Sequence, residues 1–266
     1  MSKAVKYQEL VTKRKACDVC ERDHCYLNQS VLRSEEGESF DTDEIGNFST
    51  WANDLNADLM IVAQDFSDKK TFVQHHGRIQ LEPLAEDARV GQYSTATNFY
   101  LRELTKSIDR DIGLPPSEIG SPTRNTHKGI FTTNAVLCMK PGNKMNAANP
   151  VGCVEKCGRN FLKPLIDDVI RPKAIVTLGA VATMSVLSLY TEQELAKLLR
   201  STFREIFFKA KDHPINLTSD GLRLFPMYHP GWQGRSNRKR AEKSTEEGWD
   251  LMKKDWKEIG DAMGWV

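Results

Sequence analysis

The six cysteines are the residues in this sequence most able to hold a metal. Cys17 and Cys20 form a Cys-x2-Cys pair near the N-terminus, and the remaining four are Cys25, Cys138, Cys153 and Cys157. A Cys-x2-Cys pair places two thiolates on one tight turn, and a distant second pair can complete a four-thiolate site. Spacing alone leaves structural zinc, an iron–sulfur cluster and buried cysteines without a metal as open alternatives.

Three polar residues of different chemistry follow apolar runs directly: Asp65, Asn134 and His229. A carboxylate, an amide and an imidazole can together orient a nucleophile, recognise a substrate edge and donate a proton or hydrogen bond. Each also has a structural alternative, because an aspartate can cap a turn, an asparagine can bond to backbone, and a lone histidine often only packs. Their shared position after apolar runs favours an active site.

The runs before these residues predict buried strands. Four short stretches are continuously apolar and rich in β-branched residues, namely Ala57–Asp65, Gly129–Leu137, Ala174–Gly179 and Leu222–His229. The acidic, apolar-poor residues 30–50 are predicted to form a loop. Helical spacing indicates three amphipathic helices, with stripes at Leu101, Leu104 and Ile108, at 161–170 before Pro172, and from Trp249 to Met263.

Strands that alternate with helices predict an α/β fold, in which helices cover both faces of a parallel sheet. In such sheets ligands bind beyond the carboxyl ends of the strands. Asp65, Asn134, Gly179 and His229 all fall at that edge, so we expect them to lie along one rim.

The composition is that of a globular protein, with 39% hydrophobic and 27% charged residues among 266. No apolar run approaches the roughly 20 residues that span a bilayer, and the N-terminus lacks a signal-peptide core, so we expect a cytoplasmic protein. In that compartment cysteines serve as metal ligands or thiols more often than as disulfides. The net charge of +1 gives no global nucleic-acid signal. A local basic cluster fits either phosphate binding or a solvated helix face: Arg235, Arg238, Lys239, Arg240 and Lys243.

Three segments resemble the uracil-DNA glycosylase superfamily, especially its iron–sulfur branch, family 4. Residues 133–138 (TNAVLC) are similar to the Thr-Asn-x-Val-x-Cys segment of those enzymes, and a Pro-Gly-Asn loop follows at 141–143. Residues 170–179 (IRPKAIVTLG) resemble their Ile-Arg-Pro-Lys-x-Ile-Val-x-Leu-Gly run, and His229-Pro230 matches the closing His-Pro motif. The resemblance covers most of the chain.

The resemblance implies a three-layer α/β/α sandwich with a central four-stranded parallel sheet. It implies one domain over residues 1–266, in which the N-terminal segment, about residues 1–30, completes the cluster site. It also favours a [4Fe–4S] cluster over zinc. By position the implied ligands are Cys17, Cys20, Cys138 and Cys157, and Cys25 and Cys153 are the alternatives.

The chain departs from family 4 after the first strand. Residues 63–66 (AQDF) are closer to the Gly-Gln-Asp-Pro motif of family 1, whose aspartate positions the attacking water. Gly231 occupies the third place of the closing motif, where serine or alanine is usual. The aromatic residue that stacks on the flipped base has two candidates, Phe66 and Tyr93.

The activity this implies is a monofunctional DNA glycosylase that hydrolyses the N-glycosidic bond of a flipped-out base, most simply uracil. Asp65 would stabilise the oxocarbenium-like sugar and orient water, and His229 would donate a hydrogen bond to the base carbonyl. Asn134 would recognise the imide edge of the base, with Gln64 beside it in the substrate site.

We expect DNA to be the partner of this chain. We also expect the chain to be a monomer that does not associate with membranes. Residues 231–235 are predicted to be a flexible loop that presses on DNA. Trp232 or Gln233 would fill the gap left by the flipped base, while Arg235 and Arg238 would hold phosphates.

Three other functions fit parts of this pattern. The same scaffold can excise a hypermodified base, for instance in defence against phage DNA, or bind DNA without catalysis. A zinc protein of unrelated function is the third alternative.

Overall fold

The computed structural model of the chain describes residues 1–19, 31–33, 39–41, 54–65, 96–110, 129–137, 151–190 and 193–265. Each of the four apolar runs contains a strand, which confirms the strand predictions: β3 (Leu59–Ala63), β4 (Ile130–Asn134), β5 (Ala174–Leu178) and β7 (Arg223–Met227). The polar residues that end each run lie just beyond the strand.

These strands form a sheet in the order β4-β3-β5-β7-β6. The first four are parallel, and their register places Ala63 beside Asn134, so the carboxyl ends of β3 and β4 lie level. The predicted four-stranded parallel sheet is therefore confirmed, with one addition. A fifth strand, β6 (Ile215–Asn216), pairs antiparallel with β7, and its two residues are too few to produce an apolar run.

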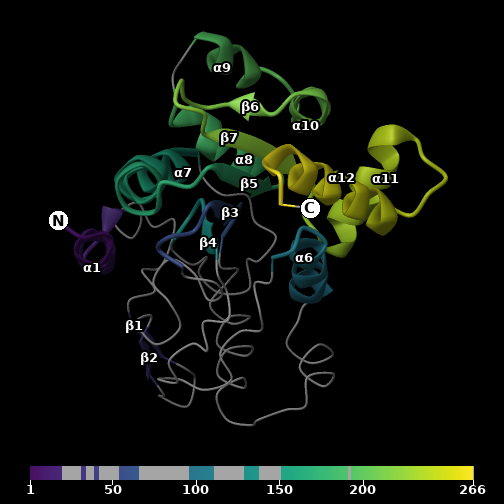
Figure 1. Cartoon of the computed structure of the whole chain (residues 1–266). Helices are drawn as coiled ribbons and strands as arrows, with labels where there is room; N and C mark the ends of the chain where they lie inside the picture. The colour runs from purple at the N-terminus through teal and green to yellow at the C-terminus, as the bar shows by residue number, and fades with distance from the viewer. Residues whose placement is uncertain are drawn as a thin grey trace.

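Helices cover both faces of the sheet (Figure 1). On one face Leu59 and Ile61 pack against α6 (Ala96–Lys106) and α12 (Gly248–Met263), which confirms the first and third predicted helices. On the other face Met60 and Val62 pack against α8 (Ala180–Ser188) and the helical segment 151–170. Successive strand residues thus alternate between two cores, as expected for a strand buried on both sides.

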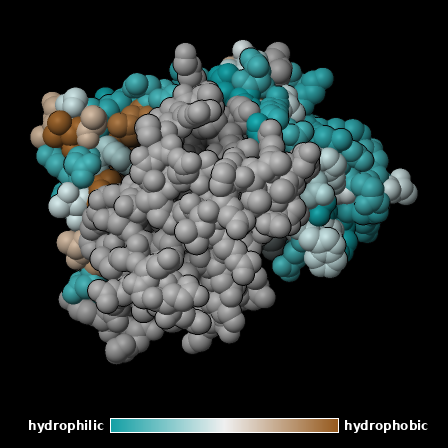
Figure 2. All heavy atoms as spheres, turned by 90° about the horizontal axis from the view of Figure 1, so that it is seen from below, coloured by the Kyte–Doolittle hydropathy of each residue, from teal (hydrophilic) through white to brown (hydrophobic). Residues whose placement is uncertain are grey.

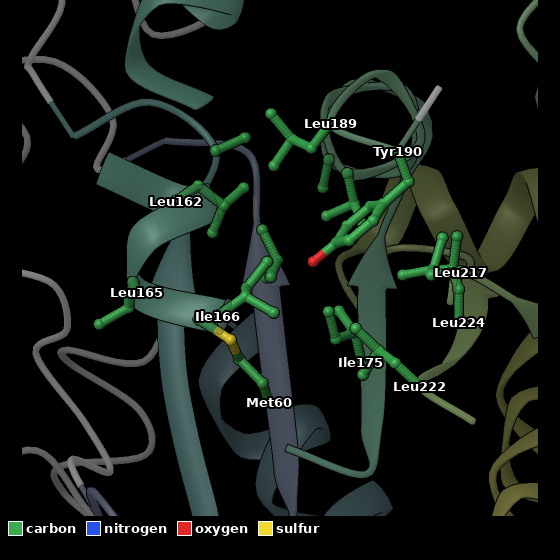
Figure 3. Packing of buried hydrophobic residues seen from close by; sticks show 14 of the residues in the cluster. Met60, Leu162, Leu165, Ile166, Ile175, Leu189, Tyr190, Leu217, Leu222 and Leu224 are labelled. Carbon is green, nitrogen blue, oxygen red and sulfur yellow. The ribbon is translucent and has the colours of Figure 1, made fainter. Parts of the chain in front are cut away.

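Segment 151–170 includes the second predicted helix (161–170) but begins ten residues earlier, and much of it is π-helical. It consists of α7 (Val151–Cys157) and two π-helical stretches, η1 (Gly158–Leu162) and η2 (Leu165–Ile170). Its apolar residues face the sheet, where Leu162, Leu165 and Ile166 lie near Met60 (Figure 3). The segment ends at Arg171 in the left-handed conformation (φ 56°), and Pro172 prevents its continuation.

The N-terminal helix α1 (Lys3–Lys15) is tied to the sheet region at both of its ends. At its start the Lys3 ammonium donates to the carbonyls of Leu55 (3.0 Å) and Ile170 (2.7 Å). At its end the buried Arg14 guanidinium donates to the carbonyl of Leu137 (3.2 Å). Helix α1 therefore runs alongside η2 from one edge of the sheet toward the other.

The remaining described elements surround these strands, and Phe207 packs in the core with Phe225 and Met227 of β7. They are α9 (Gln193–Leu198), α10 (Phe203–Asp212), α11 (Trp232–Glu242) and the antiparallel pair β1 (Val31–Arg33) and β2 (Ser39–Asp41). The prediction of a loop over residues 30–50 is wrong for β1 and β2, because two three-residue strands pair through their backbones without any apolar periodicity. No helix in the described part of the chain has the length and apolar character needed to cross a membrane.

Candidate active site

The carboxyl ends of β3 and β4 hold two of the predicted site residues side by side. Parallel pairing continues past the strands, because the Ala135 amide donates to the Ala63 carbonyl (2.8 Å) and the Val136 amide donates to the Gln64 carbonyl (3.0 Å). These bonds fix the backbone just before Asp65 against the backbone just after Asn134. Asn134 is only 9% exposed, so it is a largely buried polar residue at the end of β4.

Asp65 is held by its neighbour in the sequence. The Gln64 side-chain amide donates to Asp65 Oδ2 over 2.9 Å, and both side chains are partly buried. A hydrogen bond to one carboxylate oxygen restricts the rotation of the group. Asp65 is therefore an oriented carboxylate at the end of β3.

His229 follows β7, and Asp65 is near enough for its charge to act on the imidazole. Burial lowers the pKa of His229 below its ordinary value of 6.5, and the nearby charge of Asp65 only partly opposes this effect. The Gly231 amide donates to His229 Nδ1 (3.1 Å), so Nδ1 is an acceptor. In the neutral imidazole the proton consequently lies on Nε2, which becomes a hydrogen-bond donor without a positive charge.

Two glycines allow the surrounding backbone to approach His229. Gly179, at the end of β5, has φ +87°, and a Cβ there would lie 4.0 Å from the Cβ of His229. Gly234 is tighter, since a Cβ would lie 1.8 Å from the His229 carbonyl oxygen. Only glycine fits at that position, and it brings the first turn of α11 directly onto the backbone of His229.

The prediction of a flexible loop over residues 231–235 is wrong. Gly231 is the N-cap of α11, and the helix begins at Trp232. The close contact at Gly234 explains the difference, because it packs these residues as a helical turn against the strand end. Trp232 is nevertheless 74% exposed and Gln233 is also exposed, so both remain available to a partner.

The two arginines predicted to hold phosphates have different surroundings. The Arg235 guanidinium lies 4.0 Å from the ring centre of Tyr100, and that ring packs at a tilt against Trp249, with ring centres 4.6 Å apart. Arg238 is fully buried and bonds Asp255 through two nitrogens (2.6 and 2.8 Å) and Glu242 through one (2.8 Å). The prediction that Arg238 contacts DNA is wrong, because the residue is an enclosed ion-pair partner that joins α11 to α12.

Other members of the basic cluster remain on the surface. Arg240 and Lys243 are exposed, whereas Lys239 pairs with Glu247 at 2.6 Å. Figure 2 shows mostly hydrophilic side chains on the side of α11 and α12, and apolar ones on the opposite side near α1.

The described cysteines approach the end of β4 from two directions. Cys157, the last residue of α7, is buried, and its Sγ accepts a hydrogen bond from the Leu137 amide (3.3 Å). Cys17 follows α1 and packs against the same apolar cluster. Cys153, one turn before Cys157, is buried as well. The described residues include no group of three or more potential metal ligands.

Several predicted site residues lie outside the described residues: Cys20, Cys25, Cys138, Phe66 and Tyr93. Of the remaining candidates, the structure brings Gln64, Asp65, Asn134 and His229 to one edge of the sheet. Sequence reasoning missed Tyr100 and Gly234. The Gly-x-x-Gly spacing after His229-Pro230 was an available signal, because such glycines often mark a close backbone approach.

One comparison with known proteins found a match. No curated protein matches the chain. The sequence profile of the Uracil DNA glycosylase superfamily matches residues 51–253, which include all five strands of the central sheet and every described residue of this rim. This match supports a DNA glycosylase-type function. The chain belongs to the uracil DNA glycosylase superfamily.

Proposed function

We propose that the protein is a monofunctional DNA glycosylase that excises uracil. The observation that carries the proposal is the pairing, at the rim shared by β3, β4 and β7, of a fixed carboxylate with a neutral, Nε2-protonated imidazole. Cleavage of an N-glycosidic bond develops positive charge on the sugar and negative charge on the departing base, and this pair provides one group for each.

Asp65 serves the sugar. Its ionised carboxylate stabilises the cation that forms as the bond breaks, and its oxygens accept a proton from an incoming water molecule. The hydrogen bond from Gln64 restricts the rotation of the carboxylate, so one orientation is presented to the substrate.

His229 and Asn134 serve the base. The Nε2–H of the neutral imidazole donates a hydrogen bond to a carbonyl oxygen of the base. Comparable donors at developing oxyanions contribute roughly 2.7–4 kcal/mol to transition-state stabilisation. The Asn134 amide both donates and accepts, which matches the adjacent carbonyl and N–H groups of uracil.

Trp232 provides the group that replaces the base in the stack. It is the first residue of α11, it is mostly exposed, and it lies three residues after His229. Gln233 can bond to the partner base, while Arg240 in the same helix and Lys243 at its C-cap are exposed cations. Phe66 and Tyr93 remain the proposed stacking residues for the flipped base.

We also propose that Cys17, Cys20, Cys138 and Cys157 hold a structural [4Fe–4S] cluster. The donor set fits this group, because Cys157 is buried and accepts an N–H hydrogen bond, which favours a thiolate ligand. When bound, the cluster would cross-link the end of α1 to the segment between β4 and α7. Zinc is the alternative metal. Iron and sulfide analysis of Cys157→Ser, with Cys153→Ser as the control, tests the ligand assignment.

The function is tested by alkaline strand cleavage of a uracil-containing oligonucleotide, with the parent protein and Asp65→Asn assayed in parallel. Cleavage by the parent and not by the variant supports the proposal. Absence of cleavage by a folded, metal-loaded parent would contradict uracil as the substrate. The same assay on modified bases would then separate a different substrate from binding without catalysis.

A further inference from the structure

The edge of the sheet opposite the candidate active site contains a cavity with concentrated positive charge. The cavity, of about 430 Å³, lies where β3, β4 and β5 begin. Asp58 precedes β3, Gly129 precedes β4 and Lys173 precedes β5. Its charged lining residues are Lys3, Asp58, Arg110, Arg171 and Lys173, which comprise four cations and one carboxylate.

The cations of this cavity are poorly neutralised within the described residues. Arg110 pairs with Asp58 at 3.5 Å, and neither Lys3, Arg171 nor Lys173 has a carboxylate at ion-pair distance there. Lys3 instead donates to two backbone carbonyls, which hold its ammonium in place but do not cancel its charge. Such an arrangement attracts an anion.

Two buried polar atoms beside this cavity lack a hydrogen-bond partner. Arg110 Nε is an unused donor and Asp58 Oδ1 is an unused acceptor. Both lie close to Gly129, since a Cβ built there would lie 3.1 Å from Asp58 Oδ1 and 3.4 Å from Arg110 Nε, closer than most side chains allow. The Arg110 guanidinium is held by Trp265, whose ring centre lies 4.6 Å away.

We propose that this cavity binds a terminal phosphate group, of the kind carried by inorganic phosphate and phosphate monoesters. Phosphate oxygens accept from Arg110 Nε and from the cations at the mouth, while a P–OH group donates to Asp58 Oδ1. A phosphodiester has no P–OH group to offer Asp58, so the single carboxylate selects against the interior of a nucleic-acid backbone. The group can come from a small free phosphate or from the 5′-phosphorylated end of a DNA strand.

Calorimetric titration of the full chain with inorganic phosphate tests the site and requires no catalytic activity. The variant is Arg171→Asn with Lys173→Gln, in which asparagine tolerates the left-handed backbone at position 171. The control is Lys209→Gln with Lys257→Gln, two exposed lysines that do not line the cavity. We expect the parent and control to bind equally, and the variant to bind about tenfold more weakly, because two charge-assisted contacts are lost.

Two results would overturn the proposal: absence of phosphate binding by the parent, or equal binding by the variant and the control.

A matched pair of oligonucleotides, with and without a 5′-phosphate, identifies the source of the phosphate group. Tighter binding of the phosphorylated strand by the parent, abolished in the variant, assigns the site to DNA ends. Equal binding of the two strands, together with phosphate binding, assigns it to a small phosphate compound.

Discussion

The two edges of the central sheet use the same strands to build opposite environments. At the carboxyl edge, Asp65 is fixed by one amide and His229 is kept neutral by burial. At the amino edge, long cationic side chains surround an open cavity with a single carboxylate. The first arrangement depends on close packing of short side chains, and the second on unneutralised charge. A parallel sheet can therefore support polarised chemistry at one end and anion binding at the other.

The sharpest test of this contrast changes one carboxylate at each end of β3. Asp65→Asn should lower the rate of base release by about 10²–10⁴-fold, because it removes the group that stabilises the sugar cation and activates water. Asp58→Asn should leave that rate unchanged. Single-turnover cleavage of a uracil-containing duplex measures both, with circular dichroism as the check on folding. Equal losses in the two variants would remove the distinction between the edges.

His229→Gln should lower the same rate by about 10²–10³-fold, since a donor to the base carbonyl is lost. The pH profile of the parent protein provides a second measurement. Because burial lowers the pKa of His229, the imidazole is still mostly neutral at pH 6.5, and activity should decline only at more acidic pH. A decline centred at or above pH 6.5 would show that the histidine is not protected from protonation in this way.

Glycine-to-alanine substitutions at the two edges should separate positioning from stability. Gly234→Ala forces a Cβ into the His229 carbonyl, so it should destabilise the fold by about 1–3 kcal/mol and also slow base release by displacing α11. Gly129→Ala strains a residue at φ +86° and should cost a similar roughly 1–3 kcal/mol with no change in rate. Urea denaturation and single-turnover kinetics measure the two effects separately. A rate loss in Gly129→Ala at full folding would contradict the assignment.

The smallest effect concerns the surface of α11. Trp232→Ala should weaken binding to duplex DNA by about tenfold, in line with the roughly 1–3 kcal/mol that an aromatic contributes by stacking on a base. Trp249, which stacks on Tyr100 inside the helical layer, supplies the control: Trp249→Phe should bind DNA as the parent does. Fluorescence anisotropy with a labelled duplex distinguishes these outcomes.

The carboxyl edge was largely predictable from the sequence, and the amino edge was not. Apolar runs identify buried strands, and the parallel connection rule places the residues that follow them, such as Asp65 and Asn134, on one rim. The amino-edge cavity combines Lys3, Arg110 and Arg171 from distant parts of the chain, and no local sequence pattern predicts that these residues lie together.

The errors in the prediction for α11 have a common physical cause. The basic residues 235–243 look uniform in the sequence, yet Arg238 is buried because Asp255 of α12 neutralises it, whereas Arg240 is exposed. Residues 231–235 were predicted to be a flexible loop, but at Gly234 the missing side chain permits close packing. In both cases a tertiary neighbour, absent from the local sequence, determines the outcome.

Helix α1 also constrains the order in which the protein can assemble on the ribosome. At its start Lys3 bonds the carbonyls of Leu55 and Ile170, and near its end Arg14 bonds the carbonyl of Leu137. The helix therefore cannot dock fully until residue 170 has been synthesised. At about 5–20 residues per second, the helix waits roughly 10–30 s after its own synthesis. During that interval Cys17 is exposed to the solvent, and we expect nascent chains arrested before residue 170 to react with a thiol reagent at Cys17 much faster than the completed protein.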